Sequence, residues 1–291
     1  MSAIKTEGMS KYYGKTKGVE DLDLEVARGE FFGFIGPNGA GKSTTIRALL
    51  GLISLTEGRA EVLGMDVSKH STEILREVGY LPSQTSFWNG MRVSEVLELS
   101  ARLRKKDCSA ESKLLCERLE LDTTRKVNEL SLGNKKKVGI VAALQHSPSL
   151  YVLDEPTSGL DPLMQKEFYE ILKERNERGA TVFLSSHVLS EIGKYCKRAA
   201  IISGGRLLAS DTVDNLAHTG VKRVTLKGVA TAELDPDFKD VRLDGENVSF
   251  LFEGKSELLI AKLAGMRFED VNISDPDLEE VFMHYYTRKE L

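Results

Sequence analysis

Short apolar runs recur along the chain, and the spacing of hydrophobic and polar residues within each run predicts its secondary structure. Leu22, Leu24 and Val26 alternate with acidic residues, which is typical of a half-buried strand. Largely apolar runs predict buried strands of a parallel sheet at 31–35, 150–154 and 180–186. Runs with helical spacing predict helices at 92–104, 130–146 and 162–178. This alternation of strands and helices indicates an α/β fold.

The composition changes near residue 215, where we expect a second, smaller domain to begin. Residues 219–291 contain 15 Asp and Glu residues against 10 Lys and Arg residues. Their pattern predicts strands at 222–226, 241–243, 248–252 and 267–273, and helices at 256–264 and 278–287. We therefore divide the chain into residues 1–216 and a small accessory α+β domain of residues 217–291.

Composition and charge narrow the class of protein. With 291 residues, of which 41% are hydrophobic and 29% charged, the chain has the composition of a globular protein with one or two domains. A net charge of −4 argues against a broad basic surface for nucleic acid. Three cysteines without metal-ligand spacing indicate reduced thiols of a cytosolic protein (Cys108, Cys116 and Cys196).

No apolar run approaches the roughly 18 residues that cross a membrane. The N-terminus also lacks the apolar centre of a signal peptide. If the protein works at a membrane, another chain has to supply the membrane span.

A glycine-rich segment follows the first buried strand. Residues 36–43 read Gly-Pro-Asn-Gly-Ala-Gly-Lys-Ser, which fits the P-loop pattern G-x-x-x-x-G-K-[ST]. Glycines let successive backbone N–H groups converge on an anion, and the helix that begins near Lys42 points its positive dipole end at the same anion. We expect Lys42 to bridge the β- and γ-phosphates of a nucleotide and Ser43 to bind Mg²⁺. The predicted phosphate-binding residues are Gly36, Pro37, Asn38, Gly39, Ala40, Gly41, Lys42, Ser43, Thr44 and Thr45.

Two carboxylates and a histidine follow later strands. Asp154 and Glu155 end the run at 150–154, and His187 follows the run at 180–186. Open α/β sheets bind ligands at the carboxyl ends of their strands. We therefore expect Asp154 to hold Mg²⁺ through its shell and Glu155 to act as the general base on the attacking water. Lys42, Glu155 and His187 are the predicted catalytic residues.

The predicted helix at 130–146 begins with an unusual charge pattern. Ser131 is a suitable N-cap, but Lys135, Lys136 and Lys137 lie in the first turn, where positive charge opposes the helix dipole. This pattern indicates that a negative group approaches the helix. Three solvated lysines are the alternative interpretation.

The P-loop, the segment 130–134 (Leu-Ser-Leu-Gly-Asn), Asp154-Glu155 and His187 follow one another in an order that resembles the ATP-binding subunit of an ABC transporter. The resemblance covers residues 1 to about 216. It implies a P-loop NTPase core of the ABC ATPase type, with an antiparallel β subdomain and a helical subdomain at about 85–145. It also implies that Tyr13 stacks on adenine, that His187 contacts the γ-phosphate and that the loop at 158–161 communicates across a dimer.

In this family each ATP lies between the P-loop of one subunit and the signature segment of another. The resemblance therefore assigns Ser131, Gly133 and Asn134 to the nucleotide of a second copy. It also implies integral membrane permease subunits as partners, a location at the cytoplasmic face of the membrane, and the ligands ATP and Mg²⁺. The segment 277–282 resembles the drug- and bacitracin-resistance branch, which implies export of a drug, peptide or lipid-like compound.

Two positions depart from the family pattern. Leu132 replaces a glycine and Asn134 replaces a glutamine in the signature, so we expect retained but altered turnover. The glutamine that usually joins the site to the membrane subunit falls on Ser83 by spacing, with Gln84 one residue later. We assign Gln84 as a metal ligand beside Ser43 and Asp154, and Ser83 is the alternative.

Two other functions compete with transport. A non-transport ABC ATPase that acts on a ribosome or DNA would have the same motifs, but such proteins usually carry two ATPase modules or a long coiled-coil insertion. A P-loop GTPase should contain an Asn-Lys-x-Asp motif, whereas Asn134 is followed by three lysines. The sequence identifies neither the cargo nor the role of the C-terminal domain.

Overall fold

The apolar runs at 31–35, 150–154 and 180–186 lie side by side in one six-stranded sheet. Its strand order is β10-β9-β3-β8-β7-β6, and β9, β3, β8, β7 and β6 run parallel to one another. Every residue of β3, β7 and β8 is buried, which explains why these runs show no alternation. The strands are β3 (Phe31–Ile35), β6 (Val78–Leu81), β7 (Leu150–Asp154), β8 (Thr181–Ser186), β9 (Arg198–Ser203) and β10 (Arg206–Thr212).

A second, antiparallel sheet has the order β2-β1-β4-β5. Its strands are β1 (Ser2–Tyr13), β2 (Thr16–Ala27), β4 (Glu57–Val62) and β5 (Met65–Asp66). Leu22, Leu24 and Val26 of β2 are buried while the residues between them are exposed, so the predicted alternation is confirmed. One hydrophobic core contains residues of both sheets and of α1, among them Leu22, Ile46 and Phe183.

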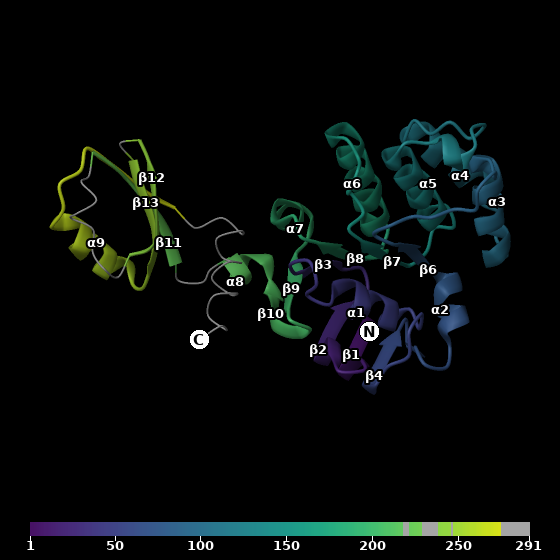
Figure 1. Cartoon of the computed structure of the whole chain (residues 1–291), viewed down its shortest axis with the longest axis horizontal. Coiled ribbons are helices and arrows are strands. Elements are labelled where there is room, and N and C mark those ends of the chain that lie inside the picture. Colours follow the sequence, from purple (N-terminus) through teal and green to yellow (C-terminus); the bar gives the residue numbers. More distant parts are fainter. Residues whose placement is uncertain (218–220, 229–237, 246, 275–291) are drawn as a thin grey trace. The chain divides into compact units, whose positions relative to one another are not determined.

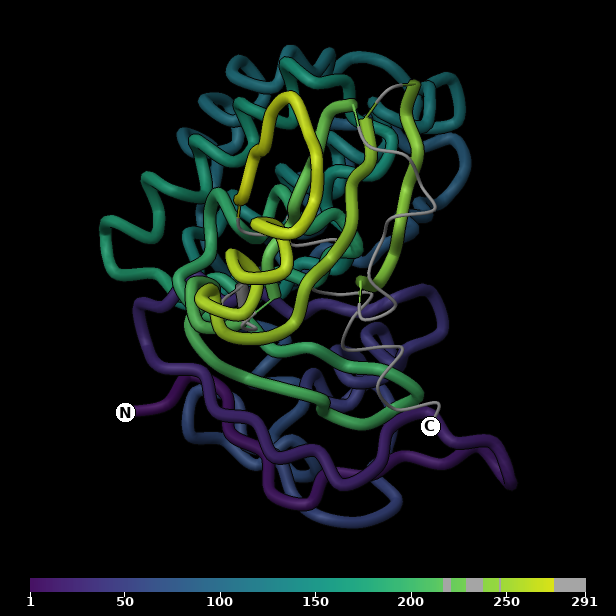
Figure 2. Tube along the Cα trace, turned by 90° about the vertical axis from the view of Figure 1, so that its left-hand side faces the viewer, coloured from purple at the N-terminus to yellow at the C-terminus, as the bar shows by residue number. Residues whose placement is uncertain are grey.

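Some of the helices cover the strands of the larger sheet, and others form a separate cluster. They are α1 (Lys42–Leu49), α2 (Ser71–Glu77), α3 (Val93–Arg104), α4 (Ser109–Arg118), α5 (Leu132–Leu144), α6 (Pro162–Glu177) and α7 (Leu189–Tyr195), with a 3₁₀ turn at Val127–Glu129. In Figures 1 and 2, α3, α4 and α5 (blue to teal) lie at one end of residues 1–211, and the purple strands β1 and β2 lie at the other. Leu103 and Leu114 fit the helical spacing of apolar residues, but their side chains are 68% and 47% exposed. They therefore do not belong to the buried hydrophobic core.

The structure is a computed structural model that describes residues 1–217, 221–228, 238–245 and 247–274. The chain divides into two compact units, Met1–Asp211 and Thr212–Leu291. In the described part of the chain, none of the helices has the length and apolar character needed to span a bilayer.

The second unit contains a four-stranded antiparallel sheet of order β12-β13-β11-β14. Phe250 and Val224 of this sheet pack with Leu259 and Leu263 of the helix α9 in a core of their own. The helix at 256–264 and the strands predicted at 222–226, 241–243 and 248–252 are confirmed. The strand predicted at 267–273 begins only at Asp270, and the predicted helix at 278–287 lies outside the described residues. The elements are α8 (Val213–Ala217), β11 (Val221–Lys227), β12 (Lys239–Asp244), β13 (Asn247–Glu253), α9 (Ser256–Ala264) and β14 (Asp270–Ser274).

Candidate functional site

The loop between β3 and α1 requires glycine at several positions. A Cβ on Gly41 would lie 2.5 Å from the carbonyl oxygen of Gly18, and one on Gly36 would lie 2.5 Å from that of Ile202. Gly39 and Gly41 also have positive φ angles, of 81° and 106°. The loop therefore follows a tight path that side chains would obstruct, and it ends where α1 exposes its first N–H groups.

Lys42 extends from the first residue of α1 back across this loop. Its ammonium donates hydrogen bonds to the carbonyl oxygens of Gly36, at 2.6 Å, and Pro37, at 3.2 Å. The same nitrogen lies 3.3 Å from Oε1 of Glu155. Lys42 is only 6% exposed, so its charge acts in a poorly solvated environment and interacts strongly with nearby anions.

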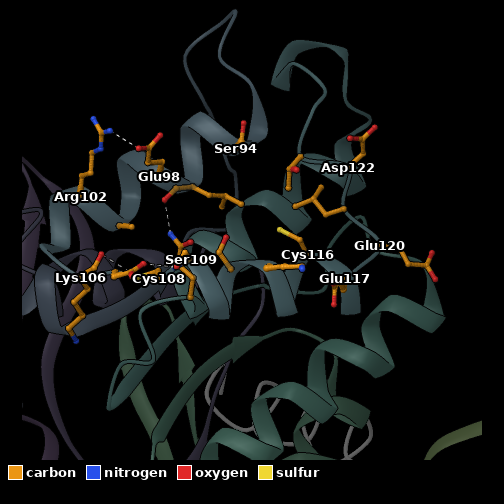
Figure 3. A pocket seen from close by; sticks show the side chains of 18 residues that line it. Ser94, Glu98, Arg102, Lys106, Cys108, Ser109, Cys116, Glu117, Glu120 and Asp122 are labelled. Atoms are coloured by element: carbon orange, nitrogen blue, oxygen red, sulfur yellow. Dashed lines mark hydrogen bonds and ion pairs between the residues drawn. The ribbon is translucent and has the colours of Figure 1, made fainter.

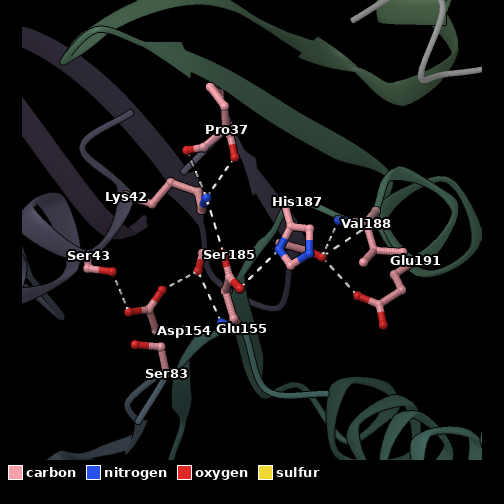
Figure 4. Close-up of polar contacts among 12 residues, drawn as sticks. Pro37, Lys42, Ser43, Ser83, Asp154, Glu155, Ser185, His187, Val188 and Glu191 are labelled. Carbon is pink, nitrogen blue, oxygen red and sulfur yellow. Dashed lines mark hydrogen bonds and ion pairs between the residues drawn. The ribbon is translucent and has the colours of Figure 1, made fainter. Parts of the chain in front are cut away.

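Asp154 lies between two hydroxyl groups (Figure 4). Ser43 donates to Oδ2 at 2.7 Å, and Ser185 donates to Oδ1 at 2.6 Å. The second contact follows from strand register, because Asp154 at the end of β7 pairs with Ser185 on β8. Ser185 was not among the predicted site residues; a serine near the carboxyl end of a buried strand was the only signal for it.

Glu155 lies between a lysine and a histidine. Its Oε1 faces Lys42, and its Oε2 lies 3.0 Å from Nδ1 of His187. Burial raises the pKa of Glu155, but the hydrogen bond from His187 and the charge of Lys42 outweigh burial and hold the pKa below its ordinary value. The carboxylate is therefore ionised at neutral pH, as a general base must be.

The backbone around Glu155 and His187 is constrained. Glu155 has a φ of 47°, a conformation that residues other than glycine adopt uncommonly. Ser186 accepts a hydrogen bond from the N–H of Val188 and donates to Glu191, which fixes the turn on which His187 stands (Figure 4). The His187 side chain itself is 53% exposed.

Lys42, Ser43 and Glu155 line a cleft of about 530 Å³. Three of the ten predicted phosphate-binding residues do not line it: Gly36 contributes its carbonyl to Lys42, Ala40 is buried, and the Thr45 hydroxyl donates to the carbonyl of Gly41. The predicted residues Asp154 and His187 contact lining residues but are not themselves part of the lining. Both Ser83 and Gln84 line the cleft. The lining residues are Tyr13, Thr16, Lys17, Gly18, Pro37, Asn38, Gly39, Gly41, Lys42, Ser43, Thr44, Ser83, Gln84, Glu155 and Ser158.

The predicted signature residues Ser131, Gly133 and Asn134 are not part of this cleft. They lie at the start of α5, where the Ser131 hydroxyl accepts a hydrogen bond from the N–H of Asn134 and confirms the predicted N-cap. A Cβ on Gly133 would lie 2.7 Å from the carbonyl oxygen of Gly159. The start of α5 therefore packs against the loop that precedes α6.

The three lysines of α5 do not share one environment. Lys136 and Lys137 are 2% and 8% exposed, so the interpretation of three solvated lysines is wrong. Burial lowers the pKa of Lys136 to about 8, and the charges of Asp154 and Glu155 oppose this change by favouring its ammonium form. The helix thus keeps these charges inside the protein.

The oxygen atoms near Lys42 suit a magnesium ion. Mg²⁺ prefers hard oxygen ligands, binds through one or two carboxylates and keeps several waters. The Asp154 carboxylate and the Ser43 hydroxyl provide such oxygens side by side, with the Gln84 side chain in the same cleft. Among the described residues, no group of three or more His, Cys, Asp and Glu side chains could hold a metal ion together.

A larger cavity, of about 990 Å³, lies between α3 and α4 (Figure 3). Its walls include Glu98, Arg102, Cys108 and Cys116, and it has no phosphate-binding loop. Both cysteines are buried, and burial raises the pKa of each thiol. The chemistry of this cavity therefore differs from that of the cleft.

The chain is similar to several known proteins. Residues 19–158 match the ABC transporter family. The chain is 35% identical to the bacitracin transport ATP-binding protein BcrA of Bacillus licheniformis over 96% of each chain. It is 34% identical to the daunorubicin resistance ATP-binding protein DrrA3 of Streptomyces coeruleorubidus over 97% of this chain and 95% of that one. A solved ATP-binding subunit of an ABC transporter, 31% identical, aligns with 74% of this chain and 92% of its own with a TM-score of 0.70.

Proposed function

The chain belongs to the ABC transporter family as an ATP-binding subunit with ATPase activity, and we propose that two copies close around two Mg-ATP molecules to drive a separate membrane permease. Residues 1–216 form the ATPase domain in this proposal, with a helical subdomain at about 85–145. Residues 217–291 form the accessory domain.

The position of the signature residues carries the proposal. Ser131 and Gly133 lie at the start of α5 and do not line the cleft that contains Lys42. A helix start offers unpaired N–H groups to an anion, so α5 can bind a phosphate held by another subunit. One chain therefore supplies two complementary halves of a site, and a symmetric pair completes both.

Several residues in and beside the cleft have positions that support specific roles. The backbone N–H groups of Asn38, Gly39 and Gly41 and the Lys42 ammonium bind the phosphates. Tyr13, 47% exposed at the cleft edge, stacks on the base. Glu155 accepts the proton of the attacking water. His187, hydrogen-bonded to Glu155, orients that carboxylate and contacts the terminal phosphate.

Ser43, Asp154 and Gln84 are the residues that would hold Mg²⁺, which neutralises phosphate charge when bound. Ser185 keeps the Asp154 carboxylate in place through its hydrogen bond to Oδ1. When both sites are closed, hydrolysis removes the group that joins the two copies, and they reopen. The permease follows this change between two states.

The relatives support export as the direction of transport. One is named for bacitracin transport and another for daunorubicin resistance, and both align with nearly the whole chain. We therefore propose that this subunit powers export of a drug, peptide or lipid-like compound. It would act at the cytoplasmic face of the membrane through a permease formed by other chains.

A Glu155→Gln variant tests the closed pair. The amide cannot accept the proton from water, so ATP stays intact and the pair accumulates. Size-exclusion chromatography with saturating Mg-ATP should show the variant at twice the mass of the chain, and the same variant with Mg-ADP should elute as a monomer. Adding Lys42→Met removes the phosphate-binding charge and should abolish the shift. A monomer at saturating Mg-ATP would contradict the proposal.

A further inference from the structure

Lys136 is a lysine that the proposed ATPase cycle does not yet use. It lies on the second turn of α5 and is 2% exposed. Its ammonium donates hydrogen bonds to the carbonyl oxygens of Pro82, at 3.2 Å, and Ser83, at 3.0 Å. Burying a charge without hydrogen-bond partners costs free energy. The two hydrogen bonds to this loop therefore stabilise the Lys136 ammonium inside the protein.

The same face of α5 carries two further contacts to this loop. A Cβ on Gly139 would lie 2.6 Å from Cγ2 of Thr85 and 2.9 Å from Cδ1 of Leu81, so glycine is what allows the loop to lie this close. The Thr85 hydroxyl donates to the carbonyl of Lys135 over a long 3.5 Å. Residues 81–85 therefore lie directly on α5, and Lys136 supplies the strongest polar contacts between them.

This contact joins two parts of the proposed ATP cycle. Ser83 and Gln84 line the cleft of their own subunit. Ser131 and Gly133, one turn before Lys136 at the start of the same helix, face the nucleotide of the second copy in the proposed dimer. A rigid helix with a buried hydrogen-bonded contact at its second turn can move the loop when its first turn engages a phosphate.

Nearby carboxylates favour the protonated form of Lys136, which donates hydrogen bonds to both carbonyl oxygens. Burial lowers its pKa to about 8, while the carboxylates of Asp154 and Glu155 oppose that change. At neutral pH the ammonium form therefore predominates. Hydrogen bonds from a charged donor are stronger than those between neutral groups.

We propose that Lys136 is a positioning residue that holds segment 82–85 on α5, so that binding of one copy's signature to the other copy's ATP repositions Ser83 and Gln84 in its own cleft. This inference rests on the proposed dimer for its second half only. The first half, the docking of the loop, concerns a single chain and is testable without a dimer.

The variant Lys136→Met removes both hydrogen bonds and retains the aliphatic stem. The loss of these hydrogen bonds is partly offset because the variant no longer buries a charge, so we expect it to fold. Lys173→Met is the matched control, because it makes the same change at an exposed lysine of α6. Thermal unfolding followed by circular dichroism should show one cooperative transition for both variants, with both folded at the temperature of the exchange experiment.

Hydrogen exchange in the nucleotide-free chain tests the docking. Amides of residues 83–88 should exchange about ten-fold faster in Lys136→Met, which corresponds to about 1.4 kcal/mol of lost local protection. Lys173→Met should exchange like wild type. Unchanged exchange in Lys136→Met would overturn the proposal whatever the state of the dimer.

The fluorescence of Trp88 can report the movement of segment 82–85 when the signature binds ATP. Trp88 is the only tryptophan in the sequence, lies just beyond this segment and is 72% exposed. In the Glu155→Gln background, Mg-ATP should change its fluorescence as the dimer forms, and Lys136→Met should abolish this change while the dimer still elutes. A full fluorescence change in a Lys136→Met dimer would overturn transmission by Lys136 and leave the proposed function intact. Failure of Glu155→Gln to dimerise would contradict the proposed function, and with it the transmission.

Discussion

The Asp154 carboxylate shows how strongly this site depends on single hydroxyl groups. It is 2% exposed and accepts hydrogen bonds from Ser43 and Ser185. Hydrogen bonds to a charged group contribute about 1.5–3 kcal/mol, and a buried carboxylate that loses one keeps its full desolvation cost. Ser185 is itself completely buried, so water cannot take its place.

We predict that Ser185→Ala lowers the free energy of unfolding by about 1.5–3 kcal/mol. It should also raise the Mg²⁺ concentration needed for half-maximal ATPase activity, because Asp154 loses the contact that orients it. Urea unfolding and a Mg²⁺ titration measure the two effects. Ser149→Ala, an exposed serine just before β7, is the control and should change neither quantity. Wild-type stability in Ser185→Ala would show that the 2.6 Å contact does not hold Asp154.

At the scale of elements, α5 packs closely against two loops. Its first turn packs against the loop before α6, where Gly133 faces the carbonyl of Gly159, and its second turn carries Lys136 and Gly139 against segment 81–85. The exposed Leu132 side chain lies over Gly159, at 3.5 Å from the place of a Cβ there. Gly133 lets the helix approach the backbone of the loop before α6, and Gly139 leaves room for the side chains of Leu81 and Thr85.

We predict that Gly133→Ala separates α5 from this loop. Its Cβ would lie 2.7 Å from a backbone oxygen, and a backbone contact relaxes only by moving an element. Overpacking of this kind costs about 1–3 kcal/mol, measured as a loss of unfolding free energy in urea. Turnover should fall more than nucleotide affinity, because the loop at 158–161 moves while Lys42 does not. Leu132→Ala changes an exposed side chain and should stay within about 0.5 kcal/mol of wild type; an equal loss in both variants would refute the close contact.

The sequence predicted the parts of this protein that depend on local pattern. The buried strands, the P-loop and the N-cap at Ser131 each follow from a few adjacent residues. The strand β1 was missed, because its polar residues such as Lys5 and Glu7 interrupt the apolar pattern. Ser185 and Lys136 were missed as site residues because their roles depend on strand register and on where the loop at 82–85 packs. Such contacts are not encoded by neighbouring residues.

At the scale of the whole chain, the two units have separate hydrophobic cores. Residues that line the cleft all belong to Met1–Asp211, whereas Phe250, Leu259 and their neighbours form the core of the second unit. A domain with its own core can in principle fold alone. Nucleotide binding by one chain should therefore need only the first domain.

We predict that a fragment of residues 1–216 folds and binds Mg-ATP with a dissociation constant within about two-fold of the full chain, because no cleft residue is removed. Isothermal titration calorimetry on Glu155→Gln versions of both chains measures this without hydrolysis. A second fragment carrying Lys42→Met serves as the non-binding control. An affinity loss of about ten-fold or more, roughly 1.4 kcal/mol, would show that residues 217–291 support the cleft.

The contact between Lys42 and Glu155 makes phosphate binding an exchange of one anion for another. The lysine already has a carboxylate 3.3 Å away, so an incoming anion is favoured only by the difference between the two attractions. A singly charged competitor such as chloride or acetate gains little over the carboxylate it displaces. A polyphosphate gains much more, because it brings several negative charges to the lysine and to the loop N–H groups together. Competition with the Glu155 carboxylate thus makes the site selective. It favours multivalent anions over the monovalent anions that outnumber them in solution.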